Sequence, residues 1–134
     1  MHEFRWPVRV YYEDTDSGGV VYYANYLKFM ERARTEWLRS LGFEQDRLVR
    51  DAGIVFAVTE AELRFLRPGR FNDALTVTAR IVERRRASLR FAQAVYRENE
   101  LLCEGSVRIA SLDAARFSPR PIPEALLREI PDVD

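Results

Sequence analysis

Apolar and polar residues alternate along the first part of the chain. The even positions from 4 to 12 are all apolar, whereas the positions between them include Arg5, Pro7 and Arg9. A period of two is typical of a strand that buries one face, so residues 4–12 are predicted to form a strand. Because proline cannot donate a hydrogen bond to a neighbouring strand, Pro7 places this strand at the edge of a sheet.

The period changes to that of a helix over residues 23–41. Apolar side chains recur there at intervals of three and four positions, at Tyr26, Met30, Ala33, Trp37 and Leu41. This spacing puts them on one face and predicts the longest helix of the chain. The oppositely charged pair Glu31 and Arg34, three positions apart, indicates an exposed outer face.

Strand-like alternation returns in four segments, residues 54–65, 74–84, 88–96 and 101–112. Short breaks separate them, at Pro68-Gly69, Arg84-Arg85-Arg86 and Glu98-Asn99-Glu100. The residue types of these breaks favour hairpin turns, and connections this short imply antiparallel pairing. One strand, one long helix and four more strands predict an α+β protein, with an antiparallel sheet curled around one long central helix. After a proline-rich stretch, a short helix is expected over residues 124–130.

Length and composition restrict the class of protein. A chain of 134 residues suits one domain, and we expect a single domain over residues 1–134. Hydrophobic residues make up 47% of the chain, which suits a packed globule. Because 21 basic side chains balance 21 acidic ones, bulk binding to nucleic acid or to an anionic membrane is not expected. Stable membrane insertion is not expected either, since no apolar stretch reaches about 18 residues.

Cysteine and histidine are scarce. Cys103 is the only cysteine, so the chain forms no internal disulfide, and a cytoplasmic location is expected. Cys103 itself is interpreted as a small buried hydrophobic residue. The only histidine is His2, next to the first residue of the chain. Histidine-rich metal sites, Ser-His-Asp triads and Cys-His pairs are therefore excluded.

The residues between the first strand and the long helix carry the main candidate chemistry. Asp14 and Asp16 lie beside Gly18-Gly19. A calcium loop is one interpretation, but its twelfth position, which requires glutamate, is Asn25. In a second interpretation, Asp16 tightens the loop or caps the helix. A third combines the Asp16 carboxylate with the unpaired N–H groups of the first helical turn, which together suffice for acyl transfer.

Arginines and tyrosines are further candidates for substrate-binding residues. Arg84, Arg85 and Arg86 form either a solvated hairpin turn or a phosphate clamp, since the guanidinium group binds phosphate through two hydrogen bonds. Arg116 and Arg120 are similar candidates. The tyrosines between residues 11 and 26 have three interpretations: part of the core, an interface, or the lining of an acyl pocket.

Several segments resemble a known family. Residues 10–22, with the sequence VYYEDTDSGGVVY, followed by Asn25-Tyr26, resemble the signature of the 4-hydroxybenzoyl-CoA thioesterase family of hot-dog proteins. Residues 29–36, FMERARTE, and residues 4–10, FRWPVRV, resemble more specifically the Tol-Pal system-associated acyl-CoA thioesterase subgroup. The resemblance implies a hot-dog fold and the hydrolysis of acyl-CoA thioesters, with no metal or prosthetic group as cofactor.

The same resemblance implies site residues and partners. Asp16 coincides with the family's catalytic aspartate. Tyr23 stands where many members of the subgroup have a catalytic histidine, but another branch carries tyrosine there and uses its backbone N–H to polarise the thioester carbonyl. We further expect Tyr26, Arg85 and Arg86 to contact the substrate. The expected partners are a coenzyme A thioester, acyl carrier protein, and further copies of the chain in a homodimer or homotetramer.

Three functions are considered at the level of sequence. In the first, the Tyr23 backbone amide binds the thioester carbonyl oxygen while Asp16 activates water or attacks to form a mixed anhydride. In the second, the chain is a catalytically weak acyl-carrier or cell-envelope interaction module, which the absence of the subgroup histidine favours. A hot-dog dehydratase is a third option, but it needs an active-site histidine.

Overall fold

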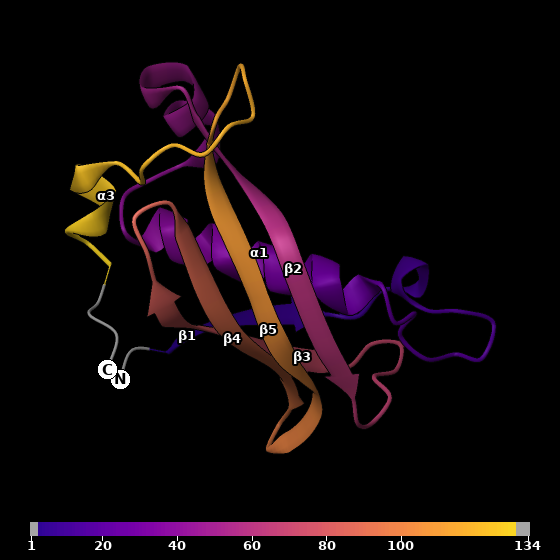
Figure 1. Cartoon of the computed structure of the whole chain (residues 1–134). Coiled ribbons are helices and arrows are strands. Elements are labelled where there is room, and N and C mark those ends of the chain that lie inside the picture. The colour runs from indigo at the N-terminus through magenta and orange to yellow at the C-terminus, as the bar shows by residue number, and fades with distance from the viewer. Residues whose placement is uncertain (1–2, 131–134) are drawn as a thin grey trace.

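The computed structural model describes residues 3–130, in which a five-stranded sheet faces one long helix (Figure 1). The strands are β1 (Phe4–Arg9), β2 (Ile54–Phe65), β3 (Ala74–Arg84), β4 (Ser88–Arg97) and β5 (Glu100–Asp113). The long helix is α1 (Asn25–Ser40). The shorter helical segments are η1 (Tyr12–Asp14), α2 (Gln45–Arg47), η2 (Leu48–Ala52) and α3 (Glu124–Leu127).

All strand pairs are antiparallel, and the order across the sheet is β1-β3-β4-β5-β2. The sheet curves around α1 (Figure 1), so the predicted α+β arrangement is confirmed. β1 is an edge strand, as expected from Pro7, and the hairpins between β3 and β4 and between β4 and β5 are also confirmed. β1 ends at Arg9, short of its predicted end, because Tyr12–Asp14 form a 3₁₀ turn.

The connection between β2 and β3 differs from the predicted hairpin. β2 pairs with β5 at one edge, whereas β3 pairs with β1 and β4, so residues 66–73 cross from one side of the sheet to the other. Gly69 accounts for this path: its carbonyl accepts the Val21 N–H at 2.8 Å and its N–H donates to the Tyr26 hydroxyl at 3.0 Å. These bonds hold the connection against the start of α1, so it cannot fold back on β2.

The apolar face predicted for α1 is buried against the sheet. Tyr26, Met30, Ala33 and Trp37 are buried, and Leu41 is half-buried. The core divides along the helix into two clusters. The first surrounds Phe29, Met30, Val77, Val95 and Leu102, and the second surrounds Trp37, Leu89, Phe91, Val107 and Leu126.

The polar face of α1 is only partly exposed. Arg34, which was predicted to pair with Glu31 on the outer face, donates from Nη1 to the Gln93 Oε1 at 2.9 Å. Burial lowers the pKa of the Arg34 guanidinium. The Gln93 Nε2 in turn donates to the carbonyls of Met30 and Thr78, each at 3.1 Å. A polar link thus joins the helix to the sheet within the apolar core.

Gly105 in β5 lies directly against the backbone of β2. A Cβ atom at this position would lie 1.9 Å from the Glu62 carbonyl oxygen on β2, which no small movement relieves. We therefore expect Gly105→Ala to lower the free energy of unfolding by about 1–3 kcal/mol, because β2 must shift on β5. Thermal denaturation measures this loss. Ser106→Ala is the matched control, and an equal loss in both variants contradicts the close-approach explanation.

Candidate active site

The loop between β1 and α1 separates the two predicted aspartates into different environments. Asp14 is buried, and its Oδ2 accepts the Tyr11 N–H at 2.8 Å. Its backbone carbonyl accepts the Tyr22 N–H at 2.9 Å and the Asn25 Nδ2 at 2.8 Å. Asp14 therefore holds the loop against the start of α1, and its carboxylate is occupied by the fold rather than presented to a ligand.

Asp16, in contrast, is exposed at the tip of the loop. Its Oδ1 accepts the Gly18 N–H at 2.8 Å, and its backbone exchanges hydrogen bonds with Val20 and Gly19 at 2.9 and 3.0 Å. One oxygen of the Asp16 carboxylate therefore tightens the loop, as in the second interpretation. The capping role is absent, because Ala24 caps α1 without a side-chain bond. The second oxygen, Oδ2, has no hydrogen-bond partner within residues 3–130, so it is available to a reacting group.

A turn immediately before α1 leaves a backbone donor unused. The Asn25 N–H donates to the Tyr22 carbonyl at 2.8 Å, and the helix begins at Asn25, later than the predicted start. The Tyr23 N–H has no acceptor in the part of the chain that the structure describes. Because the N-terminal end of a helix carries partial positive charge, this amide suits an anionic or carbonyl oxygen.

The Asp16 carboxylate and this turn lie within electrostatic reach of each other. A hydrogen bond with the Tyr23 hydroxyl raises the pKa of Tyr22, and the negative charge of Asp16 acts in the same direction. Thr15 and Val21 also pair across the loop. The two backbone segments that carry the candidate acid and the candidate amide are therefore side by side. The chemistry this permits is attack on a carbonyl carbon whose oxygen is held by an N–H group.

The tyrosines divide between surface and core. The first four are exposed, and the Tyr23 ring contacts the rings of Tyr22 at 4.8 Å and Phe65 at 6.0 Å between centroids. Tyr26 is only 3% exposed, and burial raises the pKa of its hydroxyl, which accepts the Gly69 N–H. Its observed role is to position Gly69 in the core, and its contact with the substrate stays a prediction.

The arginine cluster lies far from the Asp16 loop of the same chain. Arg85 and Arg86 follow the last residue of β3, and Arg85 pairs with Glu83 at 3.2 Å. The Asp16 loop meets the other end of β3, where the Val10 N–H donates to the Asp73 carbonyl at 3.0 Å. An 11-residue strand spans about 35 Å, so one chain does not bring the cluster and Asp16 together.

Other candidates from the sequence have structural roles. Arg120 bonds to Asp113 and to the Gly53 carbonyl, at the same end of the fold as the arginine cluster. Cys103 is fully buried, and burial raises its pKa to about 12, so it remains a neutral thiol. Among residues 3–130, no three side chains of His, Cys, Asp and Glu are grouped to hold a metal ion.

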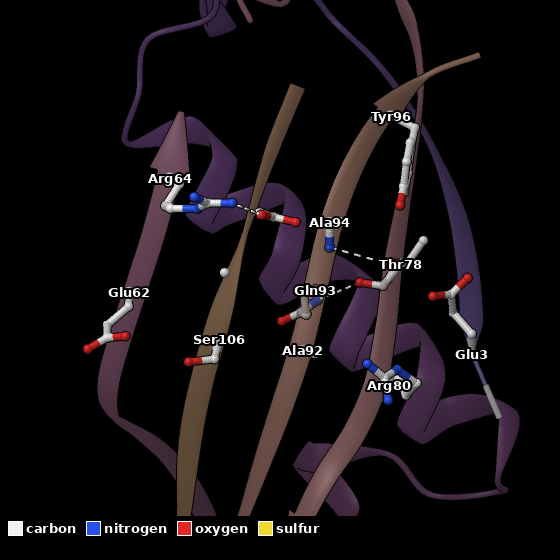
Figure 2. Close-up of a pocket in the computed structure, with 12 residues that line it drawn as sticks. Glu3, Glu62, Arg64, Thr78, Arg80, Ala92, Gln93, Ala94, Tyr96 and Ser106 are labelled. Atoms are coloured by element: carbon white, nitrogen blue, oxygen red, sulfur yellow. Dashed lines mark hydrogen bonds and ion pairs between the residues drawn. The ribbon is translucent and has the colours of Figure 1, made fainter. Parts of the chain in front are cut away.

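The cavities of the fold were not anticipated from the sequence. Figure 2 shows one of about 390 Å³ on the sheet face that points away from α1; its walls include Glu62, Arg64 and Arg80. Arg64 is ion-paired with Glu104 there. Another, of about 110 Å³, is mostly apolar and lies between α1 and the inner face of the sheet, next to Trp37. The charged residues that point outward from the strands could be recognised from the alternation in the sequence. The Asp16 loop lines neither of these two cavities.

Comparison with known proteins identifies the class of protein that carries this fold and loop. Residues 18–104 match the family model described as the thioesterase superfamily, and the chain belongs to this superfamily. Its five-stranded antiparallel sheet and central helix are the predicted hot-dog fold, which is confirmed. No helix among residues 3–130 is long and apolar enough to cross a membrane.

Individual relatives agree with this assignment. The chain is 43% identical over 127 residues to the acyl-CoA thioester hydrolase YbgC of Escherichia coli O6:H1, covering 94% of both chains. It is 40% identical over 121 residues to the acyl-CoA thioesterase YbgC of Haemophilus influenzae, covering 90% of this chain and 89% of that one. The crystal structure of a probable thioesterase from Bartonella henselae has a TM-score of 0.86 and 34% identity, covering 91% and 100%.

Proposed function

We propose that the protein is an acyl-CoA thioesterase, which hydrolyses the thioester of acyl-CoA to a free acid and CoA. The observation that carries this proposal is the pairing of an exposed carboxylate, Asp16, with the unused N–H of Tyr23 in one loop. YbgC relatives that are 40% identical or more carry the same activity in their names. We further propose that the chain belongs to the Tol-Pal system-associated subgroup of the 4-hydroxybenzoyl-CoA thioesterase family and acts in the cytoplasm as one domain over residues 1–134.

In the proposed reaction, the Tyr23 N–H donates to the thioester carbonyl oxygen as negative charge develops on it. In one route, the free oxygen of Asp16 removes a proton from water, and the water oxygen attacks the carbonyl carbon. In the other, Asp16 attacks the carbon itself and forms a mixed anhydride that water then opens. In both routes the C–S bond breaks, and CoA leaves as a thiolate that takes up a proton. In ¹⁸O-labelled water, a single turnover that releases acid without label identifies the covalent route.

The test is hydrolysis of short, long and aromatic acyl-CoAs by the purified protein. Turnover of at least one of these thioesters supports the proposal. The alternative function, an acyl-carrier or cell-envelope interaction module, is favoured by tyrosine at the position of the subgroup histidine. Binding of acyl carrier protein without turnover of any thioester selects that alternative and rejects the enzyme.

We also propose that the chain forms a homodimer or homotetramer through the β2 edge of its sheet. The opposite edge, β1, carries Pro7, which disfavours further strand pairing. β2 is 12 residues long without proline, and Val58 and Phe65 on it are about half exposed. We expect light scattering at micromolar concentration to give the mass of two or four chains. A monomer alone under these conditions contradicts the proposal.

We propose that Arg85 and Arg86 bind the substrate only in such an assembly, because within one chain they lie at the far end of β3 from Asp16. Their positive charges would hold phosphates of a CoA whose thioester lies in the partner's site. We expect replacement of both by Ala to raise KM for acyl-CoA more than KM for a pantetheine thioester without the nucleotide. Steady-state kinetics on the two substrates measure the difference, and equal effects assign the cluster to a solvated turn.

A further inference from the structure

Two aromatic side chains form an exposed stack beside the Asp16 loop. The rings of Tyr12 and Phe71 lie 3.8 Å apart between centroids and within 6° of parallel. Tyr12 is 76% exposed and Phe71 is 42% exposed. Burial of a large aromatic side chain stabilises a fold, and Tyr12 gives up most of that gain while Phe71 gives up part of it. A flat apolar surface kept in solvent is a common mark of a binding site.

Backbone hydrogen bonds fix the two segments that carry the rings. The Val10 N–H donates to the Asp73 carbonyl at 3.0 Å, and the Asn72 N–H donates to the Val10 carbonyl at 2.9 Å. Within the second segment, the Arg70 N–H donates to the Asp73 Oδ2 at 2.8 Å. Asn72 has φ of 70°, which turns the chain sharply next to Phe71. The stack is therefore preorganised, and a ligand that binds it has little backbone to order.

Positive charge accompanies the stack. The Arg70 guanidinium, next to Phe71 in the sequence, has no hydrogen bond or ion pair within residues 3–130. Arg9 lies close by, with its Nη1 donating to the Asn72 carbonyl at 3.1 Å. A ring surface with adjacent guanidinium groups matches a nucleotide, because bases stack on aromatic faces and phosphates pair with arginine.

We propose that the adenine ring of coenzyme A stacks on the free face of Tyr12, whose other face lies against Phe71, and that Arg70 binds one of the phosphates on the adenosine. The inference rests on the proposed function, since an acyl-CoA carries an adenine nucleotide at the end opposite its thioester. Tyr12 belongs to the same loop as Asp16, so this subsite and the reacting carboxylate lie on one protomer. Arg85 and Arg86 would then meet this nucleotide only from a partner chain.

The experiment compares KM for an acyl-CoA with KM for the same acyl group on 4′-phosphopantetheine, which has no nucleotide. Loss of one aromatic ring under a stacked base costs about 1–3 kcal/mol, so Tyr12→Ala should raise the ratio of the two KM values by about five- to 150-fold. Phe71→Ala removes the ring that supports Tyr12 and should raise the ratio by less. Tyr12→Trp retains a flat ring and should restore the ratio. Tyr11→Ala is the matched control, because Tyr11 is exposed in the same loop but has no ring contact within residues 3–130.

A separate arm tests the phosphate contact. Arg70→Ala should raise KM for acyl-CoA relative to the phosphopantetheine thioester, and it should weaken competitive inhibition by adenosine 3′,5′-bisphosphate. An unchanged KM ratio in Tyr12→Ala and Phe71→Ala, with wild-type turnover of acyl-CoA present, overturns the stacking subsite but leaves the thioesterase intact. Absence of wild-type turnover of every thioester instead rejects the proposed function. A ratio that changes as much in Tyr11→Ala also overturns the subsite, since the effect then belongs to the loop as a whole.

Discussion

Asp16→Asn is expected to fold and assemble like the unchanged chain and to hydrolyse acyl-CoA about 10²–10⁴-fold more slowly. The amide of asparagine has nearly the shape of the carboxylate, but it is a far poorer base and nucleophile. The exposed position of Asp16 and its single bond to the Gly18 N–H allow the substitution, because the Oδ1 of asparagine accepts the same N–H. The steady-state rate measures the loss, and thermal denaturation and light scattering verify fold and assembly.

Glu13→Gln is the matched control for this prediction. Glu13 is an exposed carboxylate in the same loop, so its substitution changes the local charge equally. It should leave kcat nearly unchanged, which separates the chemistry of Asp16 from a general effect of loop charge. If Asp16→Asn instead unfolds, while activity per folded molecule remains, Asp16 serves only to tighten the loop and the mechanism is wrong.

The elements of this fold were predictable because each depends on a local pattern. The bounds of β2 and β3 agree with the alternation of apolar residues, and the burial of α1 agrees with its helical spacing. The strand order was not predictable. It depends on hydrogen bonds between Gly69 and residues more than 40 positions earlier in the chain, Val21 and Tyr26. Periodicity within a segment carries no information about such distant contacts.

The candidate site was predictable in part, for the same reason. The short loop with two aspartates indicated where chemistry belongs, but only the fold separates buried Asp14 from exposed Asp16. Arg34 shows that a local pattern can also predict the wrong contact. Its spacing from Glu31 predicted a surface pair, yet it reaches Gln93, which is 59 positions away in sequence. The distance between Arg85 and Asp16 likewise depends on which end of β3 each segment meets.

The backbone N–H of Tyr23, rather than its phenol, is expected to stabilise the reacting oxygen. Tyr23→Phe removes only the hydroxyl and leaves the N–H before α1, so kcat should fall by less than about tenfold. Replacement of Tyr23 by its α-hydroxy acid makes the opposite chemical change. It keeps the phenol and converts the backbone N–H into an ester oxygen. Loss of an oxyanion donor costs about 10²–10³-fold, and kcat should fall by that factor.

The same replacement at Ala24 is the matched control, since its N–H also has no acceptor among residues 3–130 and follows in the same turn. It should leave kcat close to that of the unchanged chain, because the proposal assigns the carbonyl oxygen to the Tyr23 amide alone. A large loss in Tyr23→Phe, with unchanged thermal stability and oligomeric state, makes the phenol catalytic. A large loss from the ester at Ala24, with little from the ester at Tyr23, moves the donor one residue along the turn and contradicts the assignment.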